Sequence, residues 1–143
     1  MSKPIVVGMM GLPRSGKSTK VKELTEATGA PIVSKDCIRL ALHGQRYEPA
    51  AEGFVRAINQ VMLRSLILAG HKLVIVDETH YSRAARDLIK DPRWRTVFYE
   101  VVTDPIVCKQ RAIETNQEDL VPVIDEMVAR YEPLGDDEER LLE

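Results

Sequence analysis

The chain has 143 residues, of which 44% are hydrophobic and 29% are charged. This length suits one domain with a full core, and the composition is that of an ordinary globular protein. No apolar run approaches the length of a membrane span. The two cysteines, Cys37 and Cys108, are too few for a disulfide framework and lack metal-site spacing. We therefore expect one domain over residues 1–143 in a reduced, cytoplasmic compartment, with no membrane contact and no disulfide partner.

The net charge of −2 conceals an uneven distribution. Residues 1–113 carry 18 Lys and Arg against 11 Asp and Glu, whereas residues 114–143 carry 2 against 11. A basic body suits a polyanionic ligand, because cationic clefts concentrate anions. A solvated surface with a charged tail explains the same numbers, and on charge alone it is the preferred interpretation.

Strand and helix patterns alternate along the chain. Short apolar runs rich in β-branched residues predict strands, and apolar residues at helical spacing predict helices between them. In chain order we expect a strand at 4–9, a helix at 17–28, a strand at 31–35, helices at 38–43 and 51–69, a strand at 72–76, a helix at 83–89, a strand at 95–102, and helices at 105–113 and 121–131. Residues 133–143 are expected to form a flexible acidic tail. This alternation predicts a parallel sheet wrapped by helices.

The stretch GLPRSGKST, Gly11–Thr19, fits the pattern G-x-x-x-x-G-K-[ST] between the first predicted strand and helix. Two glycines allow a tight turn that points backbone N–H groups at a phosphate, and the helix adds its positive dipole end. The pattern places Lys17 at the β- and γ-phosphates, Ser18 at Mg²⁺ and Thr19 on the α-phosphate side. The predicted nucleotide-binding residues are Gly11, Leu12, Pro13, Arg14, Ser15, Gly16, Lys17, Ser18 and Thr19, with ATP and Mg²⁺ as cofactors.

An apolar strand ending in an acid, LVIVD at Leu73–Asp77, supplies the second half of the site. Proteins with this phosphate loop use such an aspartate near Mg²⁺. We therefore predict that Ser18 and Asp77 hold the metal, although Asp77 could also cap the helix that follows.

The stretch SKDCIR places Asp36 at the carboxyl end of the second predicted strand, with Arg39 one helical turn later. Open α/β sheets place ligands at this edge. An aspartate that faces the phosphate loop can accept a proton from an attacking hydroxyl. The arginine can hold an anionic neighbour of that hydroxyl or keep the aspartate ionised. A plain helix cap with a surface arginine is the alternative, and the phosphate loop makes it less favoured.

The segments GLPRSGKST, SKDCIRLALHG, LVIVDETHYSRAAR, KQR and VPVIDEMVARY, in this order and spacing, resemble the kinase domain of phage-type polynucleotide 5′-hydroxyl kinases over nearly the whole chain. The resemblance implies an α/β fold, a P-loop NTPase-type three-layer sandwich with four or five mostly parallel strands flanked by helices. It also implies that Lys17, Asp36 and Arg39 are catalytic, with Asp36 as general base and Arg39 on the acceptor side. The implied acceptor is a 5′-hydroxyl end of DNA or RNA.

The lid of the family carries two arginines four residues apart, the second of which acts on the transferring phosphate. Arg111 matches the first, which makes it a predicted nucleotide ligand, but the AIETNQEDL that follows contains no basic residue. We expect the missing charge from Arg14 in the phosphate loop, or from Arg83 or Arg86 after the third strand.

Other functions remain open. The D-x-x-R pattern also occurs in small-molecule and toxin kinases, so a nucleoside or another small alcohol is the alternative acceptor. The pair Asp77–Glu78 is typical of ATPases that polarise water with the glutamate, which makes a small ATPase the rival class. A nucleotide-binding module without catalysis is a third class. The sequence gives no oligomeric state.

Overall fold

The computed structural model describes residues 2–44 and 47–142 of the chain. Its strands are β1 (Ile5–Met10), β2 (Ile32–Ser34), β3 (Leu73–Asp77), β4 (Arg95–Glu100) and β5 (Glu139–Arg140). They form one sheet in the order β2-β3-β1-β4-β5, and every neighbouring pair is parallel. The helices are α1 (Lys17–Thr28), α2 (Lys35–His43), α3 (Glu52–Leu68), α4 (Arg83–Asp87), α5 (Pro105–Glu114) and α6 (Leu120–Arg130), with a short 3₁₀ turn, η1 (Pro49–Ala51), before α3.

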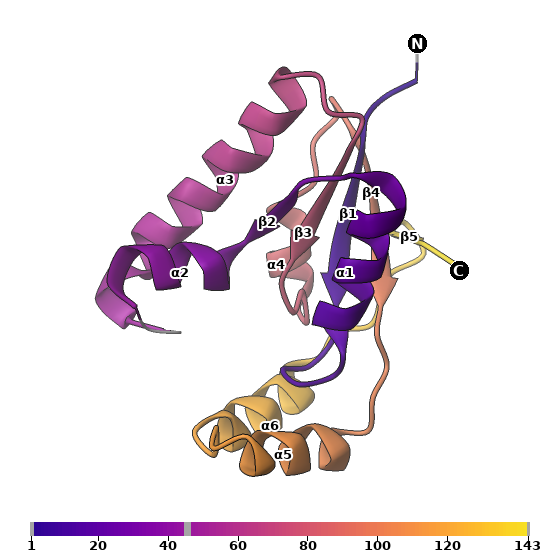
Figure 1. Ribbon diagram of the computed structural model, residues 1–143. Coiled ribbons are helices and arrows are strands. Elements are labelled where there is room, and N and C mark those ends of the chain that lie inside the picture. The colour runs from indigo at the N-terminus through magenta and orange to yellow at the C-terminus, as the bar shows by residue number, and fades with distance from the viewer. Residues whose placement is uncertain (1, 45–46, 143) are drawn as a thin grey trace.

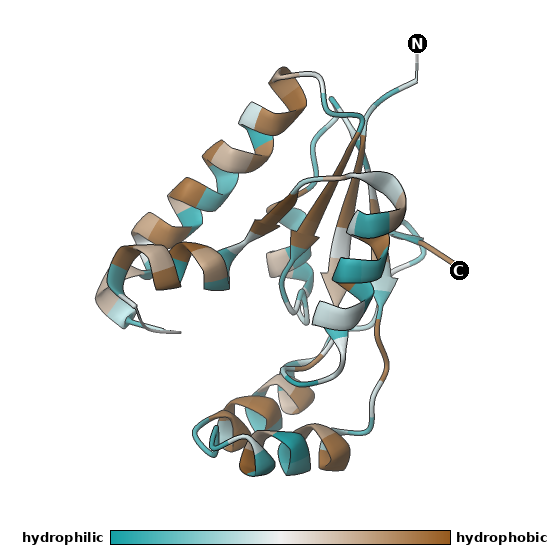
Figure 2. Cartoon of the chain, in the orientation of Figure 1, coloured by the Kyte–Doolittle hydropathy of each residue, from teal (hydrophilic) through white to brown (hydrophobic). Residues whose placement is uncertain are grey.

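Helices cover both faces of the sheet, which explains why the strands are apolar on both sides (Figures 1 and 2). On one face, alternate strand residues such as Val6 and Phe98 pack with Leu63 of α3. On the opposite face, Val7 and its neighbours pack with Val21 of α1. The fold is therefore the predicted α/β three-layer sandwich, with a sheet of five parallel strands.

Helices α5 and α6 lie beyond the carboxyl ends of the strands, next to the loop that joins β1 to α1 (Figure 1). A small apolar cluster of Cys108, Ala112 and Ile124 holds the two helices together, and Leu12 of that loop packs against it. The helical pair therefore rests on the segment predicted to bind phosphate. Among the described residues, no helix is both long enough and apolar enough to cross a membrane.

The C-terminal segment differs from the prediction of a flexible acidic tail over 133–143. Residues 139–140 form β5 against β4, where the Leu141 amide donates to the Phe98 carbonyl at 2.7 Å. Arg140 binds Glu100 at 2.8 Å, and Arg95 pairs with Glu139. Charged residues of this segment thus pair with residues far away in the sequence. Local composition does not reveal such distant partners, so it predicted a flexible tail.

The strongest of these partnerships is buried. Arg86 of α4 and Glu138 have no exposed side-chain surface, and two guanidinium N–H groups donate to the carboxylate at 3.0 and 3.2 Å. Arg86 also donates to the carbonyls of His80, Glu132 and Pro133. Glu138 further accepts from Lys90 at 2.8 Å. This cluster anchors the C-terminal segment to the loop after β3.

Candidate active site

The loop between β1 and α1 has the geometry of a phosphate cradle. Gly11 has a φ of 154°, and a Cβ there would lie 2.8 Å from Ser15 Oγ and 2.9 Å from the Val101 carbonyl oxygen, so only glycine fits. Gly16 has a φ of 101° and is the N-cap of α1. Within the described part of the chain no side chain caps this helix, and its first turn contains no acid. The positive end of α1 is therefore open to an anion.

Two further features suit a phosphate group in this cradle. Ser15 Oγ is buried and has no hydrogen-bond partner among the described residues. The Lys17 ammonium lies against the Leu12 carbonyl at 3.1 Å. A buried hydroxyl without a partner is costly unless a ligand satisfies it. The residues present therefore fit a nucleotide phosphate.

Two carboxylates act on Lys17, that of Asp77 at the end of β3 and that of Asp36 in the first turn of α2. Burial lowers the pKa of Lys17 below its ordinary 10.5, while the charges of Asp77 and Asp36 act in the opposite direction. Burial also raises the pKa of Asp77, against the effect of Lys17. The structure thus brings the ends of β2 and β3 together at the phosphate loop, as the sequence predicted.

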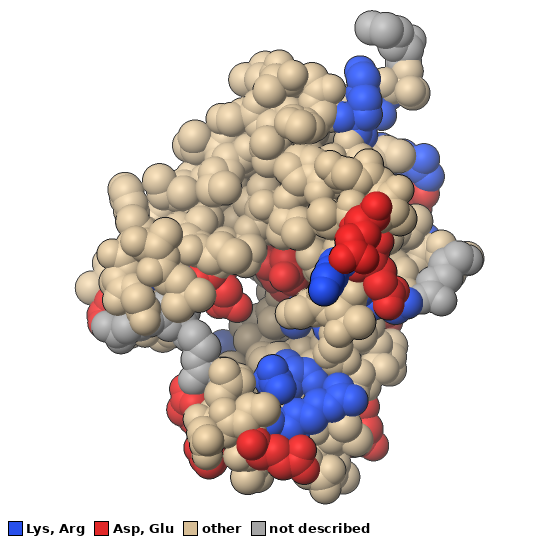
Figure 3. Space-filling view, in the orientation of Figure 1, with Lys and Arg blue, Asp and Glu red and all other residues tan. Residues whose placement is uncertain are grey.

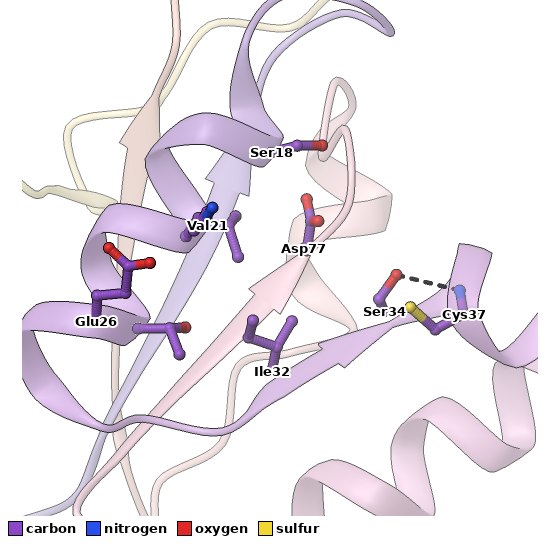
Figure 4. Close-up of a pocket in the computed structure, with 9 residues that line it drawn as sticks. Ser18, Val21, Glu26, Ile32, Ser34, Cys37 and Asp77 are labelled. Atoms are coloured by element: carbon purple, nitrogen blue, oxygen red, sulfur yellow. Dashed lines mark hydrogen bonds between the residues drawn. The ribbon is translucent and has the colours of Figure 1, made fainter.

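Ser18 and Asp77, the two predicted metal ligands, lie at the same end of a groove between α1 and the β2–β3 edge (Figure 4). The groove has a volume of about 390 Å³, and Ser34 and Cys37 line it where β2 meets α2. Hydroxyl and carboxylate oxygens are the ligands that Mg²⁺ prefers. These two side chains therefore fit the predicted Mg²⁺ of the nucleotide.

Asp36 and Arg39 belong to a chain of charges at the start of α2. Arg39 donates to Asp36 at 2.8 Å and, through Nε and the second amino group, to both oxygens of Glu52 at 2.9 and 2.7 Å. The Asp36 side chain is 70% exposed, whereas those of Arg39 and Glu52 are 17% and 12% exposed. The hydrogen bond with Arg39 lowers the pKa of Glu52, and the same bond raises the pKa of Arg39. The Asp36 carboxylate is therefore exposed to solvent, whereas the Arg39 guanidinium is fixed by its two hydrogen bonds to Glu52.

Glu78, the candidate water activator of the ATPase alternative, is enclosed by protein. Its Oε1 accepts from Asn59 of α3 at 2.9 Å, and its Oε2 lies 3.3 Å from the Lys35 ammonium. The buried His80 ring lies 3.6 Å from the same oxygen, and its Nδ1 donates to the Met9 carbonyl. Burial lowers the pKa of His80, which favours the neutral ring. Glu78 thus connects β3, α2 and α3.

The segment from β4 to α5 is attached to the phosphate loop by two hydrogen bonds. Thr103 Oγ1 donates to the Ser15 carbonyl at 2.7 Å, and Arg111 donates to the Arg14 carbonyl at 3.1 Å. The Ser15 carbonyl and the Gly16 N–H belong to one peptide group and point in opposite directions. Because the Ser15 carbonyl faces Thr103, the Gly16 N–H points away from Thr103. Figure 3 shows basic side chains gathered beside α5 where it faces the loop.

The three candidates for the missing lid arginine have different surroundings. The prediction that includes Arg86 is wrong, because its buried guanidinium is fully engaged with Glu138 and three carbonyls. Arg83 binds Asp137 at 2.9 Å and Asp87 at 3.3 Å. Arg14 is exposed within the loop at a φ of 65°. Of the three, Arg14 is the one carried by the phosphate loop itself.

The family follows from a comparison with models of known families. The model described as an AAA domain matches residues 6–134, most of the chain. The chain belongs to the AAA domain family. A comparison of this AAA domain with curated proteins gives no match.

Solved structures with the same fold include several kinases. A chain of the Pnkp1/Rnl/Hen1 complex is 21% identical with a TM-score of 0.69, and the match covers 78% of this AAA domain and 40% of that chain. A second structure is titled as the Pnkp1/Rnl/Hen1 RNA repair complex, and the match covers 46% of its chain. This AAA domain therefore spans less than half the length of both matched chains.

Two small-molecule kinases match over nearly their whole length. A gluconokinase from Sinorhizobium meliloti 1021 is 21% identical with a TM-score of 0.65, covering 98% of this chain and 83% of its own. The APS kinase CysC from Mycobacterium tuberculosis, solved with AMPPNP and APS, is 17% identical with a TM-score of 0.65, covering 99% and 89%. At these identities the matches show the shared fold.

Sequence reasoning missed the residues that support this site. Glu52, Asn59 and Thr103 are each bonded to a residue or loop that the sequence did identify. A polar Asn59 on the inner face of an otherwise apolar helix was the one signal available for them. Glu52 and Thr103 carry no local pattern that predicts a partner.

Proposed function

We propose that this AAA domain is an ATP-dependent phosphotransferase that phosphorylates a hydroxyl, in first place the 5′-hydroxyl end of a polynucleotide. The observation that carries the proposal is the exposed Asp36 carboxylate in the first turn of α2, directly after β2, whose Ser34 pairs with Asp77 of β3. A carboxylate at this place can accept the proton of an attacking hydroxyl. The likeness to a chain of an RNA repair complex supports a nucleic-acid acceptor.

In the proposed mechanism ATP supplies the phosphoryl group, with Mg²⁺ held by Ser18 and Asp77. The loop N–H groups and Lys17 hold the donor phosphates and stabilise their charge. Asp36 takes the proton of the acceptor hydroxyl as the new P–O bond forms and the bond from the γ-phosphorus to the departing ADP breaks. Arg14, exposed within the loop, supplies the positive charge that the lid lacks. Catalysis is thus mainly positioning and charge stabilisation.

A nucleoside or another small alcohol is the second candidate acceptor. The gluconokinase and the APS kinase share the fold over almost their whole length, which supports this alternative as well.

Two matched variants test the kinase against the ATPase. General-base assistance contributes roughly 10²–10⁴-fold, so Asp36→Asn should bind ATP and Mg²⁺ normally yet lose at least about 10²-fold in transfer. Glu78→Gln should have a much smaller effect on transfer, because the carboxylate of Glu78 faces Asn59 and Lys35. Single-turnover rates with radiolabelled ATP, with and without 5′-hydroxyl oligonucleotides and small alcohols, give the ranking. An inactive Glu78→Gln beside a normal Asp36→Asn would establish the ATPase instead.

A further inference from the structure

The hydrogen-bonded ladder between β2 and β3 ends just before α2 begins. Ser34 and Asp77 are the last paired residues of the two strands. Beyond them the two segments separate, because Lys35 starts α2 and Glu78 enters the loop after β3. Their side chains nevertheless meet, since the Lys35 ammonium lies 3.3 Å from Glu78 Oε2. An ion pair thus continues the connection between the two segments past the end of the ladder.

Each member of this ion pair is next to a residue of the proposed site. Lys35 directly precedes Asp36, the proposed base, and Glu78 directly follows Asp77, the proposed Mg²⁺ ligand. The Asp36 side chain itself is 70% exposed, and the bond that it accepts from Arg39 lies within α2. That bond therefore does not attach the first turn of α2 to the sheet, whereas the ion pair does.

Glu78 is well placed to anchor this turn. Its side chain is 11% exposed and that of Lys35 is 17% exposed, so solvent screens their attraction only weakly. Its Oε1 accepts from the buried Asn59 of α3 at 2.9 Å. The buried His80 ring lies 3.6 Å from Oε2 and is bonded to the Met9 carbonyl of β1 at 2.6 Å. The carboxylate is therefore held by α3 and confined by a ring that is attached to the central strand.

We propose that Glu78 is a positioning residue for phosphoryl transfer, which holds Asp36 in place through the ion pair with Lys35. This inference rests on the proposed function and adds a residue to its acceptor side. In this role Glu78 contacts neither the phosphate nor the acceptor, and Asp36 alone takes the proton. Displacement of the base slows the chemical step, because transfer depends on the alignment of the reacting groups. It leaves ATP binding unchanged.

A double-mutant cycle measures this role. Glu78→Gln and Lys35→Met each remove one charge of the pair and keep most of the side-chain shape. Each should lower the single-turnover rate of transfer to a 5′-hydroxyl oligonucleotide roughly 3- to 10-fold, the value of one net contact. This loss is well below that expected for Asp36→Asn, and the affinity for ATP and Mg²⁺ should not change. The double variant should be no slower than the slower single variant, because both substitutions remove the same interaction.

Two further variants test the cause. Lys35→Arg keeps the charge and should restore the rate to within about twofold of the wild type. Glu23→Gln is the matched control, because it removes an exposed carboxylate that lies 3.3 Å from Lys20 on α1, away from the base. It should behave as the wild type.

Amide hydrogen exchange distinguishes this inference from the proposed function. Exchange at residues 37–39 reports whether the first turn of α2 is fixed, and it should be at least about tenfold faster in Glu78→Gln and Lys35→Met than in the wild type or Glu23→Gln. This pattern would support the anchoring by Glu78 even if the wild type phosphorylated no hydroxyl, and only the proposed function would then fail.

Three results would overturn the inference. The first is unchanged exchange or an unchanged transfer rate in folded Glu78→Gln and Lys35→Met proteins. The second is a loss confined to nucleotide affinity, because Glu78 would then act on the metal through Asp77. The third is ATP hydrolysis without acceptor that stops in Glu78→Gln but continues in Lys35→Met, because Glu78 would then activate water itself.

Discussion

Replacing Glu138 by glutamine tests how strongly the C-terminal segment is attached. Burial alone would raise the pKa of Glu138, but hydrogen bonds from Arg86 and Lys90 outweigh it and lower the pKa to about 2. Relative to the ordinary value of 4.5, this difference corresponds to about 3 kcal/mol of folding free energy at neutral pH. Breaking a buried pair from one side typically costs about 3–5 kcal/mol, because the other charge stays buried. We expect Glu138→Gln to lower the free energy of unfolding by about 3 kcal/mol.

The pH dependence provides the decisive measurement. A carboxyl whose folded pKa is depressed stabilises the protein fully above its unfolded pKa, and the contribution disappears as the pH falls through the folded pKa. The difference between wild type and Glu138→Gln, measured by urea unfolding, should therefore be constant above about pH 5 and shrink between about 4.5 and 2.

The neighbouring acid supplies a control. Glu139→Gln removes an exposed partner of Arg95, and exposed pairs contribute at most about 1 kcal/mol. If Glu138→Gln and Glu139→Gln were equally mild at pH 7, or if their pH profiles coincided, the buried anchor would not exist as described.

Two other variants probe the phosphate loop. Lys17→Ala should abolish nucleotide turnover. It should not lower Tm, because burial already disfavours the charged ammonium of Lys17 in the folded state. Turnover by a folded Lys17→Ala protein would contradict the assignment of the phosphate loop. Thr103→Val should raise the KM for ATP roughly 2- to 10-fold with little change in kcat. This increase is the one expected from losing the net free energy of one hydrogen bond, that from Thr103 to the Ser15 carbonyl. Thr103→Ser should restore it, and a fall in kcat alone would argue against a positioning role.

Local patterns were sufficient for most of the fold. The helix predicted at 17–28 has those bounds, because Gly16 and Gly29 mark both of its ends. The strand predicted at 72–76 lies at 73–77. The helix predicted at 38–43 begins three residues earlier, at Lys35, because the Ser34 side chain accepts from the Cys37 amide and caps it there. The phosphate loop could be predicted because its glycines and lysine act within nine consecutive residues.

Long-range charge pairing could not be predicted in this way. No residue near Glu138 in the sequence predicts that it pairs with a buried arginine 52 positions earlier. The same holds for Glu52, which lies 13 positions from Arg39 and accepts two hydrogen bonds from it. This contact joins α2 to α3, and no local pattern in the sequence predicts it.

The Arg86–Glu138 pair also has a consequence for synthesis on the ribosome. While the chain is made from its N-terminus, the segment through Arg86 emerges 52 residues before its counter-charge. Until then α4 cannot settle into the closed interior without burying a lone cation, which is strongly unfavourable. The β1–β3 unit can pair earlier, whereas the loop after β3 must wait for residue 138. The segment around Glu138 therefore controls when the loop after β3 reaches its final form.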